Sequence, residues 1–162
     1  MKRFAILLAV VAFGLLLAQP ALAQTAQQTL TLTVGSVADM DVSGNAISLT
    51  VDTYTMGSED LTPATDASTT YNVLHNSATA KKITAGIDVA APTGTTLEVN
   101  LASTKGSGGV DVDITNATTA VDVVTGIARG ADNNQLISYT FSATTAANAF
   151  SGNRVVTFTL TD

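Results

Sequence analysis

The sequence contains no cysteine, no tryptophan, only one histidine and few aromatic residues overall. Without cysteine there can be no disulfide, no thiolate nucleophile and no thiolate zinc ligand. Any Ser-His-Asp triad would have to use His75. This residue lies at the end of a predicted strand and precedes Asn76 and Ser77, and the sequence has no nucleophile-elbow motif. We therefore expect His75 to be an exposed turn residue, and we expect the protein not to be an enzyme.

Positive charge is also scarce, with 7 Lys and Arg residues against 13 Asp and Glu residues and a formal net charge of −6. Scattered cations on an acidic surface cannot neutralise a run of phosphates. They are equally unsuited to docking on anionic lipid. Nucleic acid and anionic membrane surfaces are therefore not the expected partners.

The first 23 residues have the three regions of a signal peptide in order. Residues 2–3 are basic, residues 4–18 are apolar and uncharged, and residues 19–23 combine a helix-breaking Gln-Pro with a small-residue cleavage site. The apolar stretch is shorter than the roughly 20 residues that span a bilayer. We predict cleavage before Gln24, export to the periplasm, cell surface or medium of a bacterium, and no membrane span in the remaining chain.

Residues 24–162 consist mostly of short segments in which apolar and polar residues alternate. This period of two is typical of β-strands, and turn residues recur between the segments. The pattern predicts one all-β domain, an Ig-like Greek-key sandwich of about seven to nine strands. The expected strands are residues 29–34, 46–51, 71–75, 82–89, 97–101, 110–114, 121–127, 136–142 and 154–161.

Two acidic segments have oxygen-bearing side chains at alternate positions, as calcium loops do. The first consists of Asp39, Asp41, Ser43 and Asn45 with Gly44 between the last two, and residues 111–116 are similar. Both lack the closing Glu of an EF-hand loop. A weak calcium site at the first segment is one interpretation, and the solvent-facing side of a strand that runs into a turn is the other. No other cofactor is expected.

With its leader, its Thr-, Ala-, Gly- and Val-rich strands and its N-terminal alternating segment, the chain resembles secreted bacterial Ig-like sandwiches such as fimbrial subunits. In that family an N-terminal segment adds as a strand to a neighbouring subunit. The resemblance implies a structural or adhesive surface protein whose partners are itself or other surface subunits. It also implies that Leu30, Leu32 and Val34 mediate self-association.

Two alternatives stay open at this point. Residues 29–34 could be an ordinary first strand paired within their own sheet. The protein could also be a secreted binding module for a carbohydrate or small ligand, with residues 105–109 and 143–153 as the rim of its site. The absence of tryptophan counts against carbohydrate, which is usually bound on aromatic platforms.

Overall fold

The computed structural model describes residues 24–44 and 46–162, so the predicted signal peptide lies outside the described residues. The chain divides into two units, one ending at Val34 and one running from Gly35 to Asp162. The second unit is all-β and forms two antiparallel sheets, as the sequence predicts for a sandwich. Among the described residues there is no helix with the length and apolar character needed to cross a membrane.

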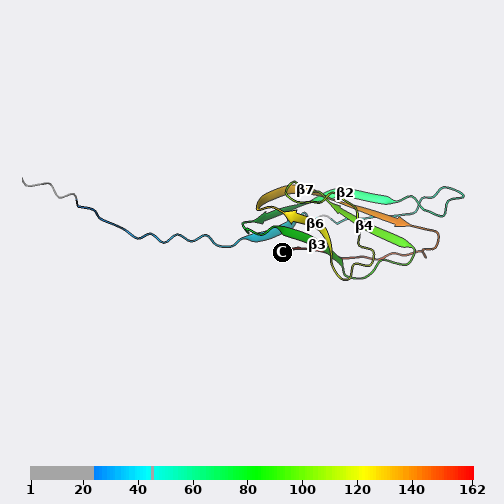
Figure 1. Ribbon diagram of the computed structural model, residues 1–162. Helices are drawn as coiled ribbons and strands as arrows, with labels where there is room; N and C mark the ends of the chain where they lie inside the picture. Colours follow the sequence, from blue (N-terminus) through cyan, green and yellow to red (C-terminus); the bar gives the residue numbers. More distant parts are fainter. Residues whose placement is uncertain (1–23, 45) are drawn as a thin grey trace, which may run out of the picture. The chain divides into compact units, whose positions relative to one another are not determined.

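The second unit contains eight strands. The five-stranded sheet has the order β1-β2-β7-β4-β5, and the three-stranded sheet has the order β6-β3-β8. Because β2, β3 and β4 follow one another in sequence but alternate between the sheets, the chain crosses repeatedly from one layer to the other, and Figure 1 shows the two layers. The strands are β1 (Ala38–Val42), β2 (Ala64–His75), β3 (Lys81–Ile87), β4 (Thr95–Leu101), β5 (Val112–Asp113), β6 (Val121–Ile127), β7 (Gly130–Ala143) and β8 (Val156–Thr161).

The core lies between the sheets and is built from alternate residues of the central strands. Ile83, Ala85 and Ile87 of β3 are buried, because the period of two directs every second side chain to the same face. Burial of a large aliphatic side chain contributes about 1.5–3 kcal/mol. The same alternation supplies the inward residues of β4 and β7, including Leu101 and Ile137.

The structure corrects the predicted strand list at the start of the domain. Residues 29–34 and 46–51 are not strands, and β1 forms instead at a segment for which the sequence left two interpretations open, a calcium loop or a strand that runs into a turn. Residues 46–51 nevertheless alternate in burial, and Ile47 and Leu49 pack against the core. Alternation predicted the inward face of this segment correctly, but the partner strand that a ladder requires is absent among the described residues.

Two predicted side-chain positions are also wrong. His75 is on β2 and only 1% exposed, because it continues the inward row of Tyr71 and Val73 rather than starting a turn. The alternation of the predicted strand 82–89 places Val89 on the inward face with Ile83 and Ile87, but Val89 follows the end of β3 and is exposed.

Candidate functional site

The most unusual feature of the sandwich is the outer edge of β8. This strand is the last in its sheet, and its outer side makes no backbone ladder with any described residue. Its inward residues Val156, Phe158 and Leu160 are only partly buried, whereas those of the adjacent β3 are fully buried. An unpaired edge whose inward side chains remain half covered has the form of a site for one more strand.

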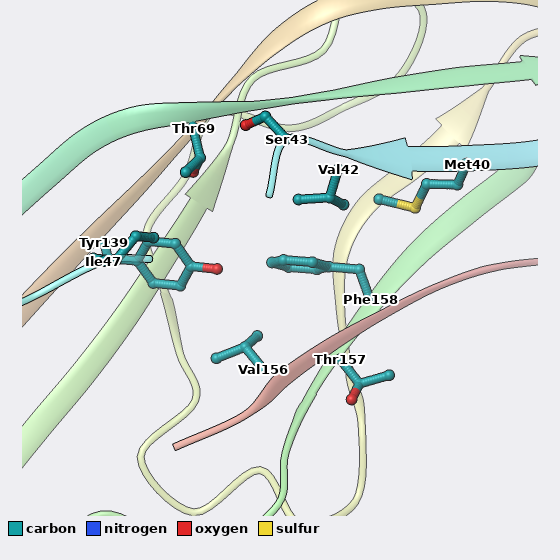
Figure 2. Close-up of a pocket in the computed structure, with 9 residues that line it drawn as sticks. All are labelled: Met40, Val42, Ser43, Ile47, Thr69, Tyr139, Val156, Thr157 and Phe158. Atoms are coloured by element: carbon teal, nitrogen blue, oxygen red, sulfur yellow. The ribbon is translucent and has the colours of Figure 1, made fainter. Parts of the chain in front are cut away.

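A hollow of about 370 Å³ opens beside this edge, between β8 and β1. Figure 2 shows the hydroxyl end of Tyr139 directed across it toward the ring of Phe158. Burial, together with the charge of Asp66, raises the pKa of Tyr139 to about 12. The lining residues are Met40, Val42, Ser43, Ile47, Thr69, Tyr139, Val156, Thr157 and Phe158.

One polar atom at the hollow lacks a partner. Thr69 is 2% exposed, and its hydroxyl makes no hydrogen bond within the described part of the chain. A buried hydroxyl without a partner costs free energy. The hollow therefore combines apolar side chains with those of hydroxyl-bearing residues, and among these the buried Thr69 hydroxyl is without a partner in the described part of the chain.

The other three sheet edges each carry a feature that discourages strand addition. Strand β1 has the charged residues Asp39 and Asp41 on its exposed side, and β5 is only two residues long. At β6, Ser107 forms a two-way backbone bridge with Thr125. Strand β8 has neither a charge nor a proline, so among the described edges it is the one that is chemically open.

The self-association residues predicted from the sequence lie in the other unit, of which residues 24–34 are described. This segment forms no strand, and Leu30, Leu32 and Val34 are 75%, 81% and 89% exposed. Three exposed apolar side chains at alternate positions are the surface that a strand would bury on one face. Their role in association remains a prediction.

The predicted calcium residues are divided between strand and turn. Asp39 and Asp41 lie on β1, and Asp39 accepts a hydrogen bond from the backbone of Met40. The hydroxyl of Ser43 accepts a bond from the backbone of Thr70, while Asn45 lies outside the described residues. In the described part of the chain no group of three or more His, Asp or Glu side chains is placed to hold a metal ion. The positions of Asp39 and Asp41 agree with the strand interpretation, and calcium binding stays untested.

A second polar cluster lies inside the sandwich around Asp132, which is 2% exposed. Its carboxylate accepts hydrogen bonds from the side-chain hydroxyls of Ser103 and Thr104 and from the backbone N–H groups of Thr104 and Lys105. Burial raises the pKa of Asp132, but these hydrogen bonds outweigh it and hold the pKa below its ordinary value. Because Ser103 donates directly to the carboxylate, this arrangement fixes a loop and differs from a triad in which histidine activates serine.

Neither loop proposed as a ligand-site rim lines the hollow. Within residues 105–109, Gly106 and Gly108 are closely packed: a Cβ added at Gly108 would lie 2.4 Å from the carbonyl oxygen of Leu101. Residues 143–153 do form the expected long connection between β7 and β8. The sequence predicted a strand over residues 154–161, which contains β8, but not that this strand is an open edge. The expected strands did not include β1, which the position of Met40 between two aspartates could have revealed.

Comparison with known proteins gives no assignment. No protein-family model matches the sequence, and no curated protein matches it significantly.

Proposed function

We propose that this chain is an exported, non-enzymatic structural or adhesive protein of the bacterial surface that associates with further copies by β-strand addition through residues 29–34. The open edge of β8 is the single observation that carries the proposal. Half-buried apolar residues along an unpaired, uncharged strand still expose apolar surface to water. Covering them with another strand therefore lowers the free energy. The exposed Leu30, Leu32 and Val34 provide a suitable apolar face.

Export and surface location rest on the signal-like residues 1–23. The all-β sandwich agrees with a structural role, but a sandwich alone does not define function.

The test compares the chain of residues 24–162 with the shortened chain 35–162, using light scattering over a range of concentrations and negative-stain microscopy. The longer chain is expected to form oligomers or filaments as concentration rises. The shortened chain is expected to stay monomeric and folded, since the unit from Gly35 to Asp162 contains the whole hydrophobic core. A monomeric longer chain at high concentration would contradict the proposal.

A second candidate, a binding module for a small ligand, is favoured by the hollow between β1 and β8. Its volume lies within the roughly 300–1,000 Å³ usual for ligand sites, and the hydroxyls of Thr69 and Tyr139 would provide the polar contacts. Ligand screening with the shortened chain separates the two functions, since a ligand site built within the sandwich would survive the deletion.

A further inference from the structure

We infer that the hairpin formed by residues 53–62 is a docking element for a second, different protein, whose surface combines apolar side chains with Lys and Arg. The hairpin contains neither residues 29–34 nor any part of β8, so this docking is independent of the proposed self-association. It is supported by the fixed conformation of the hairpin, by the apolar side chains at its tip and by its unbalanced negative charge.

Backbone hydrogen bonds fix the conformation of the hairpin. Its two arms are joined by an antiparallel bridge between Tyr54 and Leu61. Its turn is closed by the backbone N–H of Ser58, which donates to the carbonyl of Thr55 at 3.0 Å. Gly57 is the third residue of this turn and has a φ of 90°, a conformation that glycine adopts without strain. The tip is therefore an ordered turn.

The hairpin is also attached to the sandwich. The backbone N–H of Leu61 donates to the carbonyl of Ala143, and that of Thr145 donates to the carbonyl of Glu59. Figure 1 shows the hairpin projecting beyond the start of β2 and the end of β7. A projecting element that is already ordered loses little conformational entropy when a partner binds it.

The hairpin presents two large apolar side chains to solvent. Tyr54 is 66% exposed and Met56 is 86% exposed, and neither belongs to the hydrophobic core. The turn does not require them, since the positive φ is at Gly57 and the arms are joined by main-chain bonds. Tyrosine and methionine are enriched in protein interfaces, and tyrosine is frequent among the residues that dominate binding. These two side chains are suited to bury apolar surface of a partner.

The negative charge of the hairpin is not balanced by nearby cations. Asp52 precedes the hairpin, Glu59 and Asp60 lie on its second arm, and residues 24–80 contain no Lys or Arg. The two ion pairs among the described residues both use lysines of β3 and involve none of these three carboxylates. Complementary charge attracts a partner and like charge repels it. The hairpin therefore favours a basic partner surface over an acidic one.

Most of the positive charge lies at the other end of the sandwich. Of the 7 Lys and Arg residues, two precede residue 24, and four of the other five lie near the last residue of β2. Strand β2 has 12 residues, so its two ends are roughly 35 Å apart. This exceeds the Debye length of about 8 Å at physiological salt, so these cations do not neutralise the hairpin. The four residues are Lys81, Lys82, Lys105 and Arg129.

A displayed library of random peptides provides a probe for this docking. The library is selected on the chain of residues 24–162, and the Kd of each enriched peptide is measured for the unsubstituted chain and for Tyr54→Ser/Met56→Ser. The enriched peptides are expected to combine Lys or Arg with aromatic or aliphatic residues. The double substitution is expected to weaken their binding at least ~10-fold, and added salt should weaken binding to the unsubstituted chain.

Two further variants serve as matched comparisons. Val110→Ser removes another exposed apolar side chain, 63% exposed and located between β4 and β5, and should leave the Kd unchanged. Glu59→Gln preserves the shape of the side chain and should weaken binding mainly at low salt. All the substituted residues are exposed, so an unchanged Tm is expected and shows that each variant is folded.

Several results would overturn the inference. An equal Kd for the unsubstituted and the doubly substituted chain would do so, as would enriched peptides without net positive charge or a selection that enriches no peptide. Sedimentation with phosphatidylcholine vesicles tests lipid as the partner, and vesicle binding that Met56→Ser abolishes would replace the protein partner with a lipid surface. Light scattering on the same chains measures self-association separately, so failure of the docking and failure of the proposed function are distinguishable.

Discussion

The substitution Asp132→Asn is expected to destabilise the fold strongly although it preserves the shape of the side chain. Asp132 is buried, and its two oxygens accept hydrogen bonds from four donors at distances of 2.6–3.3 Å. Asparagine replaces one acceptor oxygen with an NH2 group, which would then face donors. Both backbone N–H groups, those of Thr104 and Lys105, donate to the same oxygen, Oδ2, so asparagine can keep an oxygen there. Its NH2 group then faces the Thr104 hydroxyl, which must rotate to accept.

The expected cost follows from those donors. A hydrogen bond to a charged group contributes about 1.5–3 kcal/mol, whereas a bond between neutral groups contributes about 0.5–1.5 kcal/mol. Losing the charge weakens the hydrogen bonds from all four donors, and we expect the free energy of unfolding to fall by about 2 kcal/mol. For a domain of this size the corresponding decrease in Tm is roughly 7 °C.

The pH dependence gives an independent check. The pKa of Asp132 is lowered in the folded state, so its stabilising effect is present above the ordinary carboxyl pKa and is lost as the pH falls through the lower, folded-state value. Urea unfolding of both proteins at pH 7 and at about pH 2.5 should show the difference at neutral pH and a smaller one in acid. Asp122→Asn, which removes the exposed ion pair with Lys82, is the control and should cost less than about 1 kcal/mol. A difference below about 0.5 kcal/mol at pH 7 for Asp132→Asn, or one independent of pH, would refute the reasoning.

Three further predictions concern other parts of the molecule. Leu32→Asp should weaken self-association at least ~10-fold by light scattering, whereas Thr31→Asp, with the same charge on the solvent face of the added strand, should weaken it less. Burial raises the pKa of Tyr71 to about 12, from 10.0, so the stability that the neutral phenol provides is complete below pH 10 and is lost as the pH rises toward 12. Tyr71→Phe should remove that alkaline loss and, through the lost hydrogen bond to Ala102, cost about 1–2 kcal/mol at pH 7. Millimolar calcium should leave the Tm unchanged if Asp39 and Asp41 are only strand residues, and a rise in Tm that Asp41→Asn abolishes would support the calcium site instead.

The central strands were predictable because burial on one face imposes a period of two on their sequences. In β3 and β4 the apolar residues alternate cleanly, and the structure buries them. The same alternation extends to His75. Because His75 lies two residues after Val73, its side chain is expected on the inward face, whereas its residue type alone suggested a solvent-exposed position. A buried histidine depends on a distant acceptor, here the carbonyl of Ile127, and such a contact is not visible in the local sequence.

Edges were harder to predict than centres. Strand β1 places a single large apolar residue, Met40, against the core, so its alternation is brief and its two aspartates suggested a metal loop. Residues 46–51 alternate over a longer stretch and yet pair with no described strand. Alternation reports which side chains are buried, whereas strand pairing depends on the backbone of a neighbour that the local sequence does not specify. The open edge of β8 is a property of the whole sheet order, so only the three-dimensional structure could identify it.

The proposed strand addition has a consequence for the form of the assembly. The donor segment, residues 29–34, and the acceptor edge, β8, are different surfaces of the same chain, so the contact is heterologous and each copy can both give and receive a strand. Heterologous contacts form a ring if the rotation between copies closes and an open filament if it does not. A copy lacking residues 24–34 can receive a strand but cannot give one, so it would terminate growth. Adding the 35–162 chain to the longer chain should therefore shorten the assemblies in proportion to its share, whereas a symmetric pairing of two β8 edges would incorporate both chains equally and stop at dimers.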